Sequence, residues 1–293
     1  MLIYLDGHFV AKEQALVSVF DHGFLYGDGI YETMRAYKGE LFLLKRHLWR
    51  LKRSADAISL KLPLPIEAIG EALKESLTVN KLQDAYVRIQ VSRGPGEIGL
   101  DPALCPSPTM VIVTKPFKDY PREQYEQGVS VAIVQTIRNH PLALNPAIKG
   151  TNFMNNILAR IESLKAGAAE GIMLNWKGYV AEGTISNIFM VKKGILYTPH
   201  RDTGILEGVT RDLVLKLARK KKISIKEELL RPKNFHAADE CFITNTTMEI
   251  MPVTTIDDKP VGNGRPGPVT IALLQAYRKE VLATVRQLSC VTG

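Results

Sequence analysis

The chain contains the run Ala147-Ile148-Lys149-Gly150-Thr151-Asn152-Phe153-Met154-Asn155-Asn156 and, further on, the run Val180-Ala181-Glu182-Gly183-Thr184-Ile185-Ser186-Asn187-Ile188-Phe189. A lysine such as Lys149 is usually solvated, so by itself it indicates no function. A carboxylate near the end of a strand, such as Glu182, is almost as common on a protein surface. Lys149 and Glu182 become informative together with other residues of the chain, which supply hydrogen-bond donors for an anionic group.

These donors come from three further places in the chain. Arg50 lies on a predicted amphipathic helix, the turn Gly208-Val209-Thr210-Arg211 stands at a predicted helix start, and Thr246 and Thr247 follow a predicted strand. Guanidinium groups and the free amides at a helix start both bind phosphate well. From the residues alone, Thr210 is an equally good candidate for the N-cap of its helix. An amine, an acid and phosphate donors are together what pyridoxal phosphate requires of a protein.

This set of runs, in this order, resembles the class IV aminotransferase family, which has the fold-type IV fold of pyridoxal-phosphate enzymes. The family includes branched-chain aminotransferases, D-amino-acid aminotransferases and aminodeoxychorismate lyases. The resemblance covers nearly the whole chain, from the run Phe20 to Gly29 as far as the turn Gly264-Arg265-Pro266-Gly267. It implies an enzyme with pyridoxal 5'-phosphate as cofactor, amino acids and 2-oxo acids as small-molecule substrates, and a homodimeric assembly.

The resemblance also implies a role for each matching residue. Lys149 matches the catalytic lysine, which forms the Schiff base with the cofactor and moves the proton. Glu182 matches the acid that keeps the pyridine nitrogen protonated, and Leu206 matches the residue that packs on the ring. The residues that match cofactor contacts are Arg50, Lys149, Glu182, Leu206, Gly208, Val209, Thr210 and Thr246. The residues expected to bind the substrate are Tyr31, Tyr86, Arg88 and Thr247.

Within the family, the run Tyr86 to Arg88 and the loop Arg93–Pro102 resemble the branched-chain branch. There the matching tyrosine helps bind the substrate carboxylate, and the matching arginine can take the second carboxylate of glutamate. The loop has no Arg-x-His, which is typical of the D-specific enzymes. We therefore expect an aminotransferase of branched-chain or broad specificity that uses a 2-oxo acid such as 2-oxoglutarate.

Other residues favour different members of the family. Thr33 stands where branched-chain enzymes usually have glycine, and with the run Thr244 to Met248 it points toward aminodeoxychorismate lyase, which eliminates pyruvate. Phe153 stands where branched-chain enzymes often have a tyrosine that hydrogen-bonds the ring oxygen of the cofactor. The lyase and a D-amino-acid or amine transaminase therefore remain alternatives.

Length and composition set further limits. The chain has 293 residues, 45% of them apolar and 23% charged, which predicts a folded protein. The sequence has no apolar run of the roughly 20 residues that span a membrane, and its start lacks the features of a signal peptide. Cys105, Cys241 and Cys290 show no metal-ligand spacing, so no metal site is expected, and an odd number of cysteines suits a reducing compartment, the cytoplasm.

The net charge of +8 raises the possibility of a nucleic-acid partner. Much of the excess lies in two short blocks, Lys45 to Arg53 and Arg219 to Lys222. The first lies on a predicted helix, and the second ends one, where cations favour the helix dipole. Neither block carries the interleaved aromatic residues of a recognition motif. No nucleic-acid or membrane partner is expected.

The order of helical and strand patterns predicts an α+β fold, because helices and strands mix without strict alternation. We expect a small N-terminal domain at 1–115, an interdomain linker at 116–127, which is polar and contains proline, and a large C-terminal domain at 128–293 that carries the lysine. Strands are expected at 3–5, 8–10, 86–91, 110–114, 129–134 and 241–244, and hairpins at 172–180 and 187–198. Helices are expected at 44–58, 66–77, 155–165 and 210–220, with a final helix that begins at Pro268.

Overall fold

The computed structural model describes residues 1–289, and their side chains as far as residue 285. The chain divides into two compact units. The first contains residues 1–118, residues 148–153 and the chain from residue 284, and the second contains residues 119–147 and 154–283. Cys290, one of the three cysteines, lies outside the described residues. Within residues 1–289, no helix is long and apolar enough to cross a membrane.

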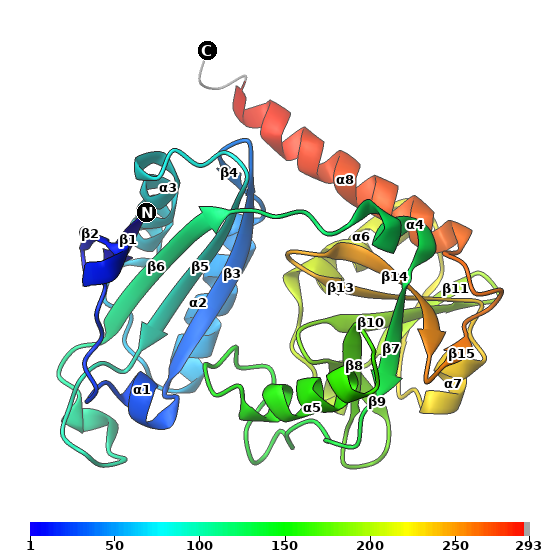
Figure 1. Ribbon diagram of the computed structural model, residues 1–293, viewed down its shortest axis with the longest axis horizontal. Coiled ribbons are helices and arrows are strands. Elements are labelled where there is room, and N and C mark those ends of the chain that lie inside the picture. Colours follow the sequence, from blue (N-terminus) through cyan, green and yellow to red (C-terminus); the bar gives the residue numbers. More distant parts are fainter. Residues whose placement is uncertain (290–293) are drawn as a thin grey trace. The chain divides into compact units, whose positions relative to one another are not determined.

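The first unit is built on an antiparallel sheet of six strands in the order β2-β1-β6-β5-β3-β4 (Figure 1). The strands are β1 (Leu2–Leu5), β2 (His8–Ala11), β3 (Gly29–Tyr37), β4 (Glu40–Leu41), β5 (Ala85–Ser92) and β6 (Thr109–Pro116). The helices are α1 (His22–Tyr26), α2 (Leu44–Ala57) and α3 (Ile66–Val79).

Alternation along β5 explains why α2 and α3 pack on one face of this sheet. Every second residue from Ala85 to Val91 is buried, and these side chains form one core with apolar residues of α2 and α3. Tyr86, Arg88 and Gln90 are half-buried on the opposite face, because successive side chains of a strand point to opposite sides. The strict alternation of residues 86–91 in the sequence predicts that these three residues share a face, and the structure confirms it.

The second unit contains a mixed sheet of nine strands in the order β12-β11-β10-β13-β14-β7-β8-β9, with β15 paired to β14. The pairs β11–β12, β14–β7 and β7–β8 are parallel, and the other pairs are antiparallel. The strands are β7 (Val129–Ile133), β8 (Glu170–Leu174), β9 (Val180–Gly183), β10 (Asn187–Lys192), β11 (Ile195–Pro199), β12 (Ile225–Glu228), β13 (Glu240–Asn245), β14 (Glu249–Ile256) and β15 (Lys259–Pro260).

The helices of the second unit cover this sheet. α5 packs against β8, and α6 packs against β13 (Figure 1). On the last helix, Leu274, Tyr277 and Val281 are buried, as the spacing of its apolar residues predicts. The helices are α4 (Arg122–Gln127), α5 (Met154–Lys165), α6 (Val209–Lys220), α7 (Pro232–His236) and α8 (Pro268–Ser289), of which α8 belongs to this unit as far as Ala283.

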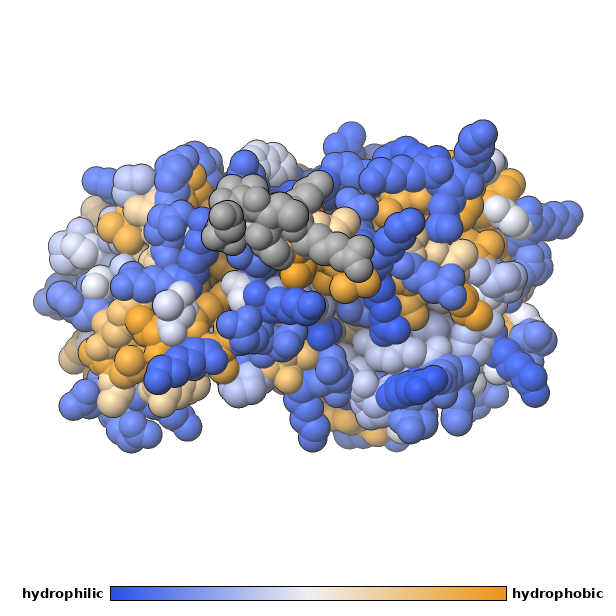
Figure 2. Space-filling model, turned by 90° about the horizontal axis from the view of Figure 1, so that it is seen from above, coloured by the Kyte–Doolittle hydropathy of each residue, from blue (hydrophilic) through white to orange (hydrophobic). Residues whose placement is uncertain are grey.

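The face drawn in Figure 2 is mainly hydrophilic, with smaller apolar areas among the charged side chains. Because folded proteins expose many apolar atoms, such scattered areas are ordinary for a chain with 23% charged residues. Among the described residues, a large cluster of buried apolar side chains lies within each unit on its sheet, and Val134, Ala159 and Met173 form a further small cluster in the second unit.

Most predicted elements agree with the structure to within a few residues at each end, but the expected linker differs, and several strands, among them β3, β12 and β14, were not expected. The segment expected as an irregular linker contains the end of β6 and the helix α4. The strand β14 was not expected, since it contains Pro252, which lies opposite Phe242 in the ladder, and proline weakens a strand prediction. The division into a domain at 1–115, a linker at 116–127 and a domain at 128–293 stays a prediction.

Candidate active site

In the first unit, the segment that carries Lys149 runs alongside β3. The amide of Tyr31 donates to the carbonyl of Lys149 at 3.0 Å, and the amide of Thr151 donates to the carbonyl of Gly29 at 2.9 Å. The Lys149 amide in turn donates to the Ser54 hydroxyl at 3.1 Å. Three hydrogen bonds therefore fix the backbone around Lys149 to β3 and α2, so the root of its side chain is held in place.

The amine of Lys149 lies against the ring of Tyr31. The Nζ atom is 2.9 Å from the Tyr31 hydroxyl and 4.1 Å from the ring centroid. The guanidinium carbon of Arg88 lies 4.0 Å from the same centroid, and the Phe153 ring packs against Tyr31 at 5.2 Å between centroids. Two cations thus share one aromatic ring, an arrangement that restrains the amine by cation–π attraction and a hydrogen bond.

Glu32, which follows Tyr31 on β3, is the centre of a buried charge cluster. Glu32 accepts hydrogen bonds from Arg50 Nε at 2.6 Å and Arg50 Nη2 at 2.9 Å, and it lies 2.8 Å from His47 Nδ1. Burial would raise the pKa of Glu32, but attraction to Arg50 and His47 and their hydrogen bonds outweigh it and hold the pKa well below its usual range. Burial lowers the pKa of His47, and this outweighs the opposing effect of Glu32.

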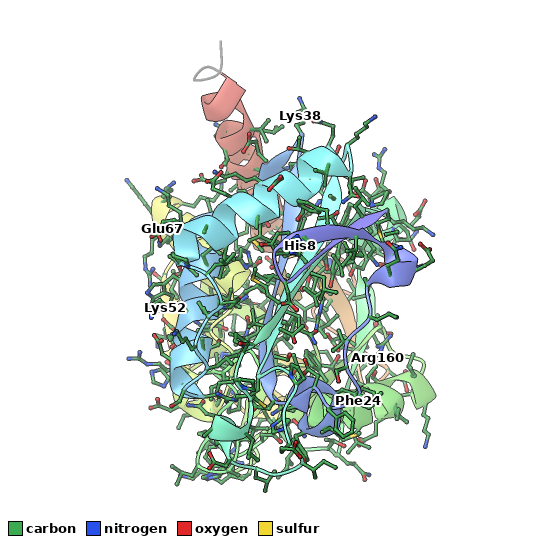
Figure 3. All side chains as sticks on the ribbon, turned by 90° about the vertical axis from the view of Figure 1, so that its left-hand side faces the viewer. His8, Phe24, Lys38, Lys52, Glu67 and Arg160 are labelled. Carbon is green, nitrogen blue, oxygen red and sulfur yellow. The ribbon has the colours of Figure 1, made fainter. Side chains whose placement is uncertain are left out.

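Arg50 therefore already has an anionic partner, and its expected phosphate contact stays a prediction. Its position on α2 explains its burial, because the helix turns Arg50 and His47 toward the sheet while Lys52 points outward (Figure 3). A guanidinium has five N–H donors, so one carboxylate does not exhaust it.

Tyr86 and Arg88, the predicted substrate residues on β5, lie on the same face of the sheet. Arg88 Nη2 donates to Gln90 Oε1 at 3.0 Å, and the Tyr86 hydroxyl lies 3.4 Å from the Thr33 hydroxyl on β3. The ladder between β3 and β5 brings these side chains together, since Thr33 stands directly opposite Arg88. The first unit thus collects Lys149 with three of the four predicted substrate residues.

In the second unit, Glu182 on β9 is buried among hydrogen-bond donors. Arg138 Nε donates to Glu182 Oε1 at 2.8 Å. Glu182 Oε2 accepts from Asn187 Nδ2 at 3.2 Å and from the Leu206 amide at 2.9 Å. Arg138 also donates to Asn155 Oδ1 at 3.0 Å, which holds the guanidinium from a second side. A carboxylate with donors at both oxygens is held in one orientation.

The start of α6 fits an anionic phosphate group. Gly208 is its N-cap, no side chain caps the helix, and Val209 and Thr210 open its first turn, where backbone amides have no acceptor within a helix. A Cβ atom on Gly208 would lie 2.1 Å from Asn187 Oδ1, so only glycine brings the backbone this close to the Glu182 cluster. The interpretation of Thr210 as the N-cap is wrong, because Gly208 is the N-cap and Thr210 already lies in the first turn of the helix.

The two threonines that follow β13 differ in their surroundings. The Thr247 hydroxyl donates to Asn245 Oδ1 at 3.0 Å and lies 3.4 Å from the Tyr120 hydroxyl. Thr246 is half-buried in the same turn. The Asn245 side chain also accepts the amides of Thr247 and Met248, so one asparagine shapes the whole turn. The contacts expected of both threonines stay predictions.

The sequence reasoning did not assign Glu32, His47 or Arg138 to the site. His47 and Arg50 are three residues apart on an amphipathic helix, and this spacing could have indicated that both face the core. Arg138 lies in an irregular segment after β7, 44 residues from Glu182, and no local pattern points to it.

Comparison with known proteins identifies the family. Residues 29–256 match the family described as Amino-transferase class IV. The chain is 44% identical over 279 residues to the "Putative branched-chain-amino-acid aminotransferase" of Methanocaldococcus jannaschii, which covers 95% of this chain and 96% of that protein. It is 36% identical over 280 residues to the D-alanine aminotransferase of Staphylococcus epidermidis, covering 95% and 97%.

A solved structure agrees. The branched-chain amino acid aminotransferase of Thermobaculum terrenum, in its PLP-form, superposes with a TM-score of 0.86 at 28% identity, covering 96% of this chain and 93% of that one. The chain belongs to the class IV aminotransferase family. The predictions of the family, of its fold-type IV architecture and of a pyridoxal-phosphate-dependent aminotransferase are confirmed at the level of the family.

Proposed function

We propose that this protein transfers amino groups between a branched-chain or similar aliphatic L-amino acid and a 2-oxo acid such as 2-oxoglutarate. Support comes from the relatives. One of them is named for branched-chain amino acids, and the chain matches it over nearly its whole length. The observation that carries the proposal is the restrained amine of Lys149 beside Tyr31 and Arg88. The lysine suits proton transfer, and the arginine suits a dicarboxylate.

The proposed cofactor residues are those of the two units described above. Pyridoxal 5'-phosphate, when bound, supplies an aldehyde carbon for the substrate amine and a ring that withdraws electrons. Lys149 would hold and then release this carbon, and its amine would move the proton. Glu182, oriented by Arg138, would hold the proton at the ring nitrogen. Phosphate would be bound by Arg50, Gly208, Val209, Thr210 and Thr246, and Leu206 would pack on the ring.

Arg88 is the proposed determinant for the second carboxylate of glutamate or 2-oxoglutarate. A charge-assisted contact of this kind contributes roughly 1.5–3 kcal/mol, so Arg88→Leu should weaken 2-oxoglutarate by about 10- to 100-fold. Leucine as amino donor should be affected far less. Single-turnover kinetics of each half-reaction distinguishes the two effects, and equal losses for both substrates would remove Arg88 from this role.

A second candidate is aminodeoxychorismate lyase. It is favoured by Thr33, whose hydroxyl lies 3.4 Å from the Tyr86 hydroxyl and adds bulk on the sheet face that carries Arg88. The decisive experiment compares a panel of L- and D-amino donors with 2-oxoglutarate against aminodeoxychorismate. We expect transfer from leucine, isoleucine or valine. Pyruvate release from aminodeoxychorismate without transfer from any amino acid would assign the protein to the lyase branch.

We also propose that the protein is a homodimer in which the loop Arg93–Pro102 reaches the active site of the second copy. Support comes from an apolar surface on the first unit. On α1, Phe24 is 72% exposed and points outward (Figure 3), and on the loop Ile98 and Leu100 are 73% and 84% exposed. The Gly99 amide donates to the Tyr26 hydroxyl, which joins the loop to α1. Large exposed apolar patches mark interaction sites.

Sedimentation tests the assembly. The wild-type protein should sediment as a dimer, and Leu100→Asp should lower the dimer fraction and the activity together. Leu229 in the second unit is 51% exposed and offers the matched position: Leu229→Asp should leave both unchanged. An active monomer would contradict the proposal. The cytoplasmic location and the absence of a nucleic-acid partner rest on the sequence and stay predictions.

A further inference from the structure

Glu170 is a buried carboxylate that no part of the proposed chemistry uses. It begins β8 and is 2% exposed. Its Oε1 atom accepts the amides of Gly171 at 2.9 Å and Thr184 at 3.1 Å, together with the Thr184 hydroxyl. Its Oε2 atom accepts the Ser186 hydroxyl at 2.9 Å and the Ile185 amide at 3.4 Å. Five donors from two segments therefore converge on one side chain.

Within the described residues, Glu170 forms no ion pair. Burying a carboxylate is costly unless hydrogen bonds replace the water that it loses. Here the replacement comes almost entirely from residues 184–186, because only the Gly171 amide belongs to the strand of Glu170 itself. Such concentration of donors on one short segment indicates that the carboxylate determines the conformation of that segment.

Residues 184–186 form the connection between Glu182 on β9 and Asn187 on β10. The Gly183 amide donates to the Ser186 carbonyl at 2.7 Å, which closes the connection into a tight bend. A Cβ atom on Gly183 would lie 2.2 Å from the Ser186 hydroxyl and 3.0 Å from Glu170 Cγ, so the bend packs directly on the Glu170 side chain. The bend brings Asn187 back toward Glu182, where Asn187 Nδ2 donates to Glu182 Oε2 at 3.2 Å.

We propose that Glu170 is a positioning residue for Glu182: its carboxylate fixes the bend at residues 184–186 and thereby sets the Asn187–Glu182 contact that orients the acid for the cofactor ring. This inference rests on the proposed role of Glu182 at the ring nitrogen. Glu170 itself touches neither substrate nor cofactor. It acts through the bend, since four of its five donors belong to residues 184–186 and two of these four are backbone amides.

The test compares three glutamate-to-glutamine variants of the holoenzyme. Glu170→Gln replaces an oxygen acceptor by an NH₂ group, which cannot accept the hydroxyl and amide donors that it would face. Glu182→Gln defines the signal expected when the ring loses its acid. Glu240→Gln is the matched control, because Glu240 is 6% exposed and accepts the Val269 amide and both the amide and hydroxyl of Thr270, at the start of α8.

Two measurements report the result besides activity. The ¹⁵N chemical shift of a labelled pyridine nitrogen in the bound cofactor reports whether the ring is protonated. Hydrogen exchange of the peptide that contains residues 183–187 reports the rigidity of the bend. For Glu170→Gln we expect a nitrogen chemical shift part of the way toward the Glu182→Gln value and faster hydrogen exchange at residues 183–187. We also expect a kcat about tenfold lower with little change in KM, which is the scale of losing an outer hydrogen-bond partner of a functional ligand.

For Glu240→Gln we expect a wild-type nitrogen shift and wild-type exchange at residues 183–187, whatever its stability. A wild-type nitrogen shift in Glu170→Gln, together with a changed shift in Glu182→Gln, would overturn the role of Glu170 alone. A wild-type shift in Glu182→Gln would instead overturn the proposed function of that acid. If Glu170→Gln does not fold, Ser186→Ala removes one donor from the same carboxylate, and an unchanged nitrogen shift and unchanged exchange there would overturn the role equally.

Discussion

Glu32 in the first unit and Glu182 in the second are both buried carboxylates that accept hydrogen bonds from an arginine, but their partners come from different places. The partners of Glu32 lie one turn apart on the single helix α2. The partners of Glu182 come from three separate segments of the chain. A local pair of helix residues thus completes one cluster, whereas the other is complete only when the second unit has folded.

The two clusters also differ in the chemistry of their donors. Glu32 is held by an arginine and a histidine on a helix that packs on the sheet, so its cluster anchors α2 to β3. The partners of Glu182 include one arginine, one side-chain amide and one backbone amide. We therefore expect changes at Glu32 to act mainly on stability, and changes at Glu182 to act mainly on catalysis.

The largest effect is expected at Lys149, which lies beside the Glu32 cluster in the first unit. Lys149→Ala should lower transamination by at least about 10⁴-fold, the upper range of general acid–base catalysis, because attachment of the cofactor is lost as well. Borohydride reduction followed by peptide mapping should place the pyridoxyl group on Lys149 in the wild-type protein. Lys52→Ala, on the exposed side of α2, is the control, and an adduct on any other lysine would sink the assignment.

Glu32→Gln should lower the free energy of unfolding by about 3 kcal/mol, because it leaves Arg50 buried without its carboxylate. Denaturant unfolding of the purified protein measures this loss. Glu71→Gln removes an exposed carboxylate that pairs with Lys74 on α3, and it should change stability by less than about 0.5 kcal/mol. Equal losses in the two variants would show that the Glu32 cluster does not anchor α2.

Glu182→Gln should slow turnover by about 100-fold or more, the scale of removing one electrostatic stabiliser, while the fold and cofactor binding are kept. Arg138 retains its hydrogen bond to Asn155, which limits the loss of stability. Steady-state kinetics alongside cofactor absorbance measures both properties. Near-normal turnover would contradict the role of Glu182, and a stability loss as large as that of Glu32→Gln would erase the contrast between the clusters.

The smallest effect concerns pH. The folded state lowers the pKa of His47, so the unfolded chain takes up its proton first, and stability falls as pH falls below the ordinary value of 6.5. The loss cannot exceed about 1.4 kcal/mol per pH unit for one proton. Glu32 also has a lowered pKa, so its contribution is lost in turn below 4.5.

His47→Gln should therefore flatten the stability curve between pH 6.5 and 4.5, the ordinary values of the two groups. His8→Gln, on the exposed strand β2, should leave the curve as in the wild-type protein. Unfolding measured across this range tests both variants. A wild-type slope in His47→Gln would show that His47 does not titrate as its surroundings predict.

Much of the fold could be predicted because it is encoded locally. The alternation from Tyr86 to Val91 predicted both the strand β5 and the face that carries Arg88, and the apolar spacing from Leu44 predicted α2. Prediction was poorer where a local rule opposed the fold. Pro252 obscured β14, although the ladder on both sides of that residue stabilises the strand.

The sequence by itself determined the family, the helices and strands with strong periodicity, and the set of residues that match a pyridoxal-phosphate site. Each of these depends on neighbours within a few residues or on a run that can be matched directly. Only the tertiary structure decided that Arg138 orients Glu182 across 44 residues and that Glu170 holds the bend beside it. No spacing rule predicts such contacts, because sheet pairing and packing bring distant segments together only in the folded chain.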